Sequence, residues 1–265
     1  MTLEQAFEIF RNNLNVAAGQ EQQVSERRER LIERLQSTWR PDKIIPIGSW
    51  ARKTAIPPIK DIDLMLVLTG LSWEQKTPHV ILNDLETELR TKYPVTREQP
   101  RSIGLRFEDF NFDIVPALAR SSGGYHIPDT TDPRGWIFTD PEKHRKLAAE
   151  SEPMVITIVK MLKSWNVTKK VGLKSFHLEV MVLRALKQKP PSYAKGVQLA
   201  FESLARDARV SCGDPGGSDN VLDKYLTTNR DTIVRMLHEA AQRMALANSS
   251  LSQAVARDVF GSPFP

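Results

Sequence analysis

The sequence contains a single cysteine, Cys212, among its 265 residues. One thiol cannot form an intrachain disulfide, and it cannot supply the cysteine pairs of a zinc cluster. Long hydrophobic runs are also missing, because the longest strongly apolar stretch, residues 62–68, contains Asp63 and is far too short to cross a bilayer. The first ten residues carry two glutamates where a secretory signal would be basic. We therefore expect a soluble, cytoplasmic protein with no membrane partner.

The common nucleotide-binding and catalytic signatures are absent as well. The sequence has no P-loop, no G-x-G-x-x-G and no G-x-S-x-G. Residues 177–179 match the H-x-E half of a zinc deaminase signature, but one cysteine cannot supply the P-C-x-x-C half. These absences exclude the commoner nucleotide-binding folds without excluding nucleotides as ligands.

What is present is typical of a globular protein with a basic surface. Hydrophobic residues make up 40% and charged residues 26% of the chain. The 37 basic and 32 acidic residues give a net charge of +5, which favours an anionic partner such as a nucleotide or a nucleic acid. The stretch SERRERLIER (25–34) is typical of a solvated helix face with ion pairs one turn apart. A nucleic-acid-binding face is the alternative.

Hydrophobic periodicity divides the chain into a mixed half and a helical half. In the first half the predicted elements are helices over 3–17, 21–39 and 79–93 and strands over 43–47, 62–69, 95–99, 103–107 and 110–115. After a predicted loop over 121–139, the helices are 141–150, 153–166, 174–187, 193–207 and 220–247, followed by a plain tail. The expected fold class is α+β: a mixed β-sheet core with N-terminal helices over 1–150, and a C-terminal helical bundle over 151–265.

The strongest chemical signal is the segment GSWARKTAIPPIKDIDL (48–64) together with NFDIVPAL (111–118). Residues two apart in a strand point the same way, so Asp61 and Asp63 project from one face. Asp113 alternates with apolar neighbours in a later strand and can project towards the same place. Carboxylate oxygens suit hard cations such as Mg²⁺. Three carboxylates from adjacent strands therefore predict a two-metal site for an in-line displacement at phosphorus.

Gly48 and Ser49 close the preceding strand and are candidates for phosphate binding. Glycine allows close backbone approach to a phosphate, and serine offers a hydroxyl and an N–H to the same group. Asp113 is a candidate proton acceptor. In the structural alternative, Asp61 and Asp63 form a turn at the start of the strand and Asp113 lies at a sheet edge. Aspartates inside apolar strands are costly unless something ligates or solvates them, which favours the metal site.

The pattern GS…DIDL with a later strand aspartate resembles the polymerase-beta-like nucleotidyltransferases. More narrowly, the chain is similar to the CD-NTases of antiphage signalling, bacterial relatives of cyclic GMP-AMP synthase and oligoadenylate synthase. The resemblance covers about residues 43–225, and no Cys/His cluster is present for the zinc-containing insertion of the animal synthase. The stretches that carry the closer match are GSWARKTAI, the loop 123–144, KMLKSWN (160–166) and LKSFHLE (173–179).

This resemblance implies a set of site residues and two Mg²⁺ or Mn²⁺ ions. Asp61, Asp63 and Asp113 match the catalytic, metal-binding carboxylates. The matches to nucleotide-binding residues are Gly48, Ser49, Lys163 and Ser175 for the phosphates and Phe176, often Tyr in the family, for the base. Without the resemblance, Lys163 is typical of a solvated helix lysine and Phe176 of a core residue.

The implied activity is the joining of nucleoside triphosphates, ATP among them, into a cyclic or short linear oligonucleotide with release of pyrophosphate. The product would activate a separate effector protein in bacterial antiphage defence. A template-independent polymerase that extends DNA, RNA or tRNA ends or makes longer oligonucleotides is the main alternative. A transferase acting on a protein or drug and an inactive nucleotide-binding module are two further alternatives. The sequence leaves open the base, the sugar, the linkage, ring closure, the activating trigger and the oligomeric state.

Overall fold

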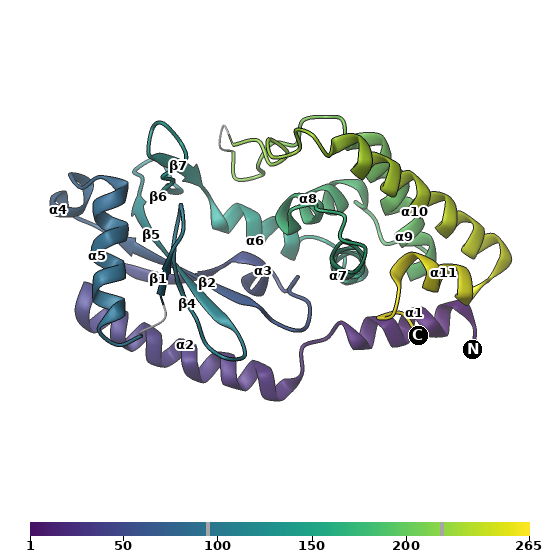
Figure 1. Cartoon of the computed structure of the whole chain (residues 1–265), viewed down its shortest axis with the longest axis horizontal. Coiled ribbons are helices and arrows are strands. Elements are labelled where there is room, and N and C mark those ends of the chain that lie inside the picture. The colour runs from purple at the N-terminus through teal and green to yellow at the C-terminus, as the bar shows by residue number, and fades with distance from the viewer. Residues whose placement is uncertain (94–95, 218–219) are drawn as a thin grey trace. The chain divides into compact units, whose positions relative to one another are not determined.

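The computed structural model describes residues 1–93, 96–217 and 220–265, and these residues divide into two compact units (Figure 1). The α/β unit comprises residues 16–145 and 216–220. The helical unit comprises residues 1–15, 146–215 and 221–265. The sequence-based division placed the first helix with the sheet, whereas the first fifteen residues belong to the helical unit.

The α/β unit contains a mixed sheet of seven strands within the described residues. The strands are β1 (Lys43–Ile47), β2 (Asp61–Leu68), β3 (Thr96–Glu98), β4 (Ile103–Leu105), β5 (Asn111–Ala119), β6 (Tyr125–Pro128) and β7 (Trp136–Thr139). Their order is β1-β2-β5-β4-β3, with β6 paired to β5 and β7 paired to β6. β2 and β5 are parallel, and the other pairs are antiparallel. The predicted mixed sheet is therefore confirmed. Residue 95, the first of the predicted strand 95–99, lies outside the described residues.

The two faces of this sheet bury different sets of side chains. Leu64, Leu66 and Ile114 belong to a core that includes residues of α2 (Ala18–Trp39) and α5 (Pro78–Arg90), the two helices drawn beside the strands in Figure 1. Met65 and Val115 belong to a second core with residues of β6 and β7. Because side chains alternate along a strand, the odd-numbered residues at the start of β2 lie on the face opposite α2 and α5.

Two parts of the α/β unit differ from the sequence prediction. The predicted loop 121–139 is wrong, because β6 and β7 pair there as a hairpin. Each strand has four residues between glycine- and proline-rich turns, so hydrophobic alternation is too short to read. Two single-turn helices, α3 (Gly48–Ala51) and α4 (Leu71–Glu74), were not predicted for the same reason.

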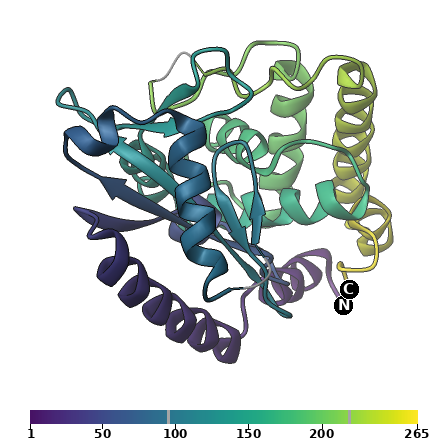
Figure 2. The ribbon, with the colours of Figure 1, turned by 60° about the vertical axis from the view of Figure 1, so that its left-hand side comes forward.

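The helical unit packs its helices around an apolar core. Its helices are α1 (Leu3–Asn13), α7 (Pro153–Thr168), α8 (Ser175–Ala185), α9 (Tyr193–Asp207), α10 (Arg230–Ser250) and α11 (Gln253–Phe260), while α6 (Pro141–Ala149) spans the boundary with the α/β unit. The long helix α10 runs alongside α9 (Figure 2). Among the described residues, no helix combines the length and the apolar character needed to span a bilayer.

The end of the chain corrects two predictions. The last long helix begins at Arg230, not at residue 220, and a further helix, α11, follows it and includes the first two residues of the predicted plain tail VFGSPFP (259–265). Phe260 and Phe264 are fully buried against the rings of Phe7 and Phe10 in α1, with ring centroids 4.9–5.9 Å apart. Eight residues of helix give only two apolar turns, so the segment carried little periodic signal.

Candidate active site

The parallel pairing of β2 with β5 brings two of the predicted carboxylates together. In its register Asp63 lies opposite Asp113, and Asp61 lies opposite Asn111. Side chains at paired positions of neighbouring strands project from the same face of a sheet. The prediction that Asp113 lies on a strand adjacent to Asp61 and Asp63 is confirmed.

The electrostatic environment of Asp63 reflects this crowding. Burial raises the pKa of Asp63 to about 6, and the nearby carboxylates of Asp113 and Asp61 also act to raise it, while Arg52 acts in the opposite direction. A carboxyl group with a raised pKa is one whose charged form is under-compensated by its surroundings. A bound cation would supply that compensation.

Gly48 lies directly against Asp63. The antiparallel pairing of β1 with β2 sets Ile47 opposite Asp63, and the chain then turns at Gly48 with φ = +69°. A Cβ atom at position 48 would lie 2.6 Å from the carboxylate carbon of Asp63 and would collide with its Oδ2. Position 48 therefore requires glycine for two reasons, the left-handed backbone and the space that the carboxylate takes. From the sequence alone, only the close approach of a phosphate was a reason for glycine at this position.

Ser49, the second predicted phosphate contact, follows Gly48 in the short helix α3 and is half-buried. Its carbonyl oxygen accepts a hydrogen bond from the backbone N–H of Thr54 at 2.9 Å. Thr54 is itself fully buried, so the segment after β1 is held by a packed residue rather than being an open loop. This fixes the backbone of Gly48 and Ser49 beside β2.

Two amide side chains that the sequence analysis did not predict contact the carboxylates. Gln99 Nε2 donates to Asp113 Oδ1 at 2.7 Å, and Asn111 Nδ2 donates to Asp61 Oδ1 at 3.0 Å. Gln99 lies in the turn between β3 and β4, and β4 pairs with β5 so that Gly104 lies opposite Asp113. Asn111 could have been found, because it lies two residues before Asp113 in an alternating strand. Gln99 could not, because its position depends on the pairing of three strands.

The three aspartates meet only some of the requirements of a metal-binding site. Within the described ranges, no group of three or more His, Cys, Asp or Glu side chains is arranged to hold a metal ion. Asp61 is instead bonded to Asn111. The oxygen-only donor set and the crowded negative charge at Asp63 do suit a hard divalent cation. The three-carboxylate metal site therefore stays a prediction, now with a paired core of Asp63 and Asp113.

The remaining predicted residues belong to the helical unit. Lys163 on α7 donates from Nζ to Glu179 Oε2 on α8 at 2.8 Å, and both side chains are buried. The interpretation of Lys163 as a solvated lysine is therefore wrong. Ser175 is the first residue of α8 and is exposed, while Phe176 beside it is half-buried rather than part of the core. Ser175 and Glu179 lie one turn apart on α8, so they share a helix face.

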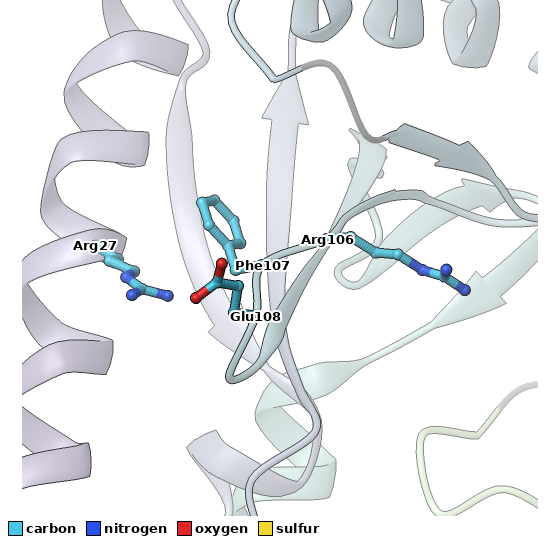
Figure 3. Close-up of a pocket in the computed structure, with 4 residues that line it drawn as sticks. All are labelled: Arg27, Arg106, Phe107 and Glu108. Carbon is cyan, nitrogen blue, oxygen red and sulfur yellow. The ribbon is translucent and has the colours of Figure 1, made fainter.

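A pocket of about 510 Å³ on the α/β unit involves the arginine-rich part of α2. It is lined by Arg27, Arg106, Phe107 and Glu108 (Figure 3). The Arg27 guanidinium lies 5.3 Å from the ring centroid of Phe107, and it forms an ion pair with Asp109. Arg27 thus ties α2 to the turn before β5, which differs from the ion pairs one turn apart that the sequence predicted within this helix.

Comparison with solved structures identifies the fold. CdnC of E. coli MS115-1, solved with ATP, has a TM-score of 0.80 at 20% identity over 99% of this chain and 98% of its own. The CD-NTase CdnG of Bradyrhizobium diazoefficiens, solved with GTP, has a TM-score of 0.83 at 17% identity over 98% of this chain and 96% of its own. The chain therefore has the fold of CdnC and CdnG, and the predicted α+β class is confirmed.

The family is shown by sequence. The SMODS pattern, described as the Second Messenger Oligonucleotide or Dinucleotide Synthetase domain, matches residues 1–151, and the chain belongs to this family. A probable cyclic nucleotide synthase of Bacillus cereus is 25% identical over 89% of this chain and 86% of the relative. A cyclic AMP-AMP-AMP synthase of an Acinetobacter species is 26% identical over 82% of this chain and 71% of the relative. The chain is thus a nucleotidyltransferase of the CD-NTase group, which joins nucleoside triphosphates into an oligonucleotide signal.

Proposed function

We propose that the chain makes a cyclic or short linear oligonucleotide from nucleoside triphosphates, ATP among them, at the carboxylates Asp61, Asp63 and Asp113. The observation that carries this proposal is the pairing of Asp63 with Asp113, with the backbone of Gly48 packed against Asp63. This arrangement puts two acidic groups and a side-chain-free stretch of backbone side by side. Such a site can take a triphosphate at the glycine and a nucleophile at the acids.

The reaction follows from these positions. The hydroxyl oxygen of one nucleotide attacks the α-phosphorus of another, and the bond to the bridging oxygen of the pyrophosphate breaks. Asp113 accepts the proton of the attacking hydroxyl, and Gln99 holds the carboxylate of Asp113 in place. Two Mg²⁺ or Mn²⁺ ions, held by the three aspartates, would activate the hydroxyl and balance the charge on the leaving pyrophosphate. Gly48 and Ser49 hold the donor triphosphate.

The helical unit supplies the nucleotide contacts of this proposal. Ser175 and Lys163 bind phosphate oxygens, and Phe176 stacks on the base. The ion pair with Glu179 fixes the direction of the Lys163 ammonium, and a hydrogen bond from this buried ammonium to a phosphate oxygen requires that the nucleotide reach it. Stacking on a base needs an accessible ring face and no hydroxyl, and Phe176 is half-buried rather than fully buried.

The product would act as a signal for a separate effector protein in bacterial antiphage defence. The family description as a second-messenger synthetase supports this role. One solved structure of CdnC is a complex with HORMA-deltaN, so a regulatory protein partner is a further expectation for this chain.

The test is product analysis. The purified protein is incubated with labelled NTPs, or separately dNTPs, with Mg²⁺ or Mn²⁺, and the products are treated with phosphatase and resolved. A short phosphatase-resistant product that the Asp61→Ala/Asp63→Ala variant does not make supports the proposal, and omission of single nucleotides identifies its bases. A ladder, or a product formed only on a supplied nucleic-acid end, would support the polymerase instead.

A further inference from the structure

The loop before α10 reaches the start of α8 through Tyr225. The hydroxyl of Tyr225 accepts a hydrogen bond from the backbone N–H of Lys174 at 2.7 Å, and it lies 3.0 Å from Nδ1 of His177. Lys174 and His177 are the residues on either side of Ser175 and Phe176. The Tyr225 side chain therefore contacts the residues before and after Ser175 and Phe176, the two predicted nucleotide contacts on α8.

The Tyr225 hydroxyl acts as a capping group for α8, because it accepts a hydrogen bond from a backbone N–H at the start of the helix. The first N–H groups of a helix have no partner within it, and within the described residues the N-cap Lys174 provides no side-chain cap. Accepting the Lys174 N–H leaves the Tyr225 hydroxyl free to donate its single proton to His177. Burial lowers the pKa of His177 and raises the pKa of Tyr225 to about 12, so the imidazole stays neutral and the phenol keeps its proton.

The described residues near Tyr225 are held by further hydrogen bonds. The Asp223 carboxylate accepts from the backbone N–H of Cys212 at 2.7 Å and from Arg230 at 2.8 Å. Gly213 and Val221 form an isolated β-bridge beside it. The Tyr225 ring meets the His177 ring edge-on, with centroids 5.8 Å apart. Tyr225 thus contacts α8 from a segment that hydrogen bonds to Cys212 and Arg230 hold in place.

We propose that Tyr225 is a positioning residue for the nucleobase, which fixes the first turn of α8 so that Phe176 presents its ring at a constant place and angle. The proposal rests on the proposed role of Phe176 as the base platform. The effect on catalysis is indirect, because Tyr225 touches the backbone and His177 and not the base. Better positioning of a base that is bound equally in ground and transition states lowers KM and leaves kcat unchanged.

The test compares Tyr225→Phe with Tyr193→Phe, which removes a hydroxyl from another buried tyrosine of the helical unit. We expect Tyr225→Phe to raise KM, and the dissociation constant of a non-hydrolysable nucleotide, about five- to twentyfold, the effect of one to two lost hydrogen bonds, with kcat within about twofold. The nitrogen chemical shift of His177 Nδ1 should move away from the hydrogen-bonded value. Tyr193→Phe should leave KM, the dissociation constant and the chemical shift of His177 Nδ1 unchanged. If Tyr225→Phe folds poorly, His177→Leu provides a second test. It removes the side chain that hydrogen bonds to the Tyr225 hydroxyl and should raise KM in the same way.

Phe176→Ala separates the two proposals. If Phe176→Ala weakens nucleotide binding while Tyr225→Phe and His177→Leu bind as the wild type does, the positioning role is overturned and the platform stands. If Phe176→Ala leaves nucleotide binding unchanged, the proposal that Phe176 stacks on the base is wrong, and the proposed positioning role of Tyr225 is wrong as well. A fall in kcat at constant KM for Tyr225→Phe would also overturn the positioning role.

Discussion

The carboxylate of Asp63 occupies the space that a side chain at Gly48 would need. Gly48 directly follows β1 and Asp63 lies near the start of β2, and the antiparallel pairing of these strands brings them together. The backbone proposed to carry the donor phosphates is therefore packed against one of the proposed metal-binding carboxylates. A change at either residue should act on both functions at once.

Gly48→Ala is expected to lower kcat/KM about 100-fold or more. The new Cβ would displace the Asp63 carboxylate, and alanine would be strained at φ = +69°. Steady-state kinetics of nucleotide incorporation check this. Gly19→Ala in α2 is the matched control, because a Cβ there meets no atom within 4 Å and alanine favours a helix. Equal activity of the two variants would contradict the close packing at Gly48.

Asp63→Asn should change how stability depends on pH in the absence of metal. The pKa of Asp63 in the folded protein, about 6, lies above its ordinary value of 3.8. The folded wild type thus binds more protons than the unfolded chain between these values, and its free energy of unfolding falls as the pH rises through about 4 to about 6. The asparagine amide of the variant cannot ionise, so we expect the variant to be more stable than the wild type by about 1–2 kcal/mol at neutral pH and no more stable at about pH 4.

Denaturant unfolding in EDTA across this range measures the difference between the two proteins. Added Mg²⁺ should then stabilise the wild type at neutral pH and leave Asp63→Asn unchanged, because a ligand that binds only the folded state raises its stability. If the free energy of unfolding depends on pH in the same way in both proteins, the pKa of Asp63 is not raised in the folded state.

Much of the α/β unit could be predicted from the sequence, because alternation and hydrophobic runs report directly on buried strands. The shared face of Asp61 and Asp63 followed from their spacing, and the alternating apolar neighbours of Asp113 indicated that it lies in a strand. The contact of Gln99 with Asp113 could not be predicted, because it depends on which strands pair and in which register. The β6–β7 hairpin and α11 were missed because each is too short to show its period.

Gln99→Leu is expected to lower Mn²⁺ affinity and kcat/KM about 10- to 100-fold. Without the Gln99 amide, the Asp113 carboxylate loses the hydrogen bond that orients it. Removing a hydrogen-bond partner of a metal-binding group commonly lowers metal affinity or activity by this factor. Mn²⁺ titration by electron paramagnetic resonance gives a readout that does not depend on turnover. Gln22→Leu, at an exposed position where the amide bonds to Glu26, is the control. Wild-type Mn²⁺ affinity in Gln99→Leu would contradict the orienting role.

Lys163→Met tests whether the buried lysine serves the fold alone. Removing one member of a buried ion pair leaves Glu179 without its Lys163 partner and should cost about 3–5 kcal/mol of stability. The double variant Lys163→Met/Glu179→Met should recover most of that loss, because two apolar side chains of similar volume replace the pair. Its KM for nucleotide should nevertheless stay raised. A double variant with normal stability and normal KM would confine Lys163 to a structural role.

The central claim is that phosphodiester formation occurs at the Asp63–Asp113 pair, and the release of pyrophosphate from mixed NTPs with Mn²⁺ tests it most directly. The rate is compared among the wild type, Asp63→Asn, Asp113→Asn and Asp84→Asn, the last a partly exposed carboxylate paired with Lys76 in the same unit. We predict a loss of at least about 1000-fold for each of the first two variants and a rate within about twofold of the wild type for Asp84→Asn. Substantial pyrophosphate release by folded Asp63→Asn or Asp113→Asn would contradict the claim.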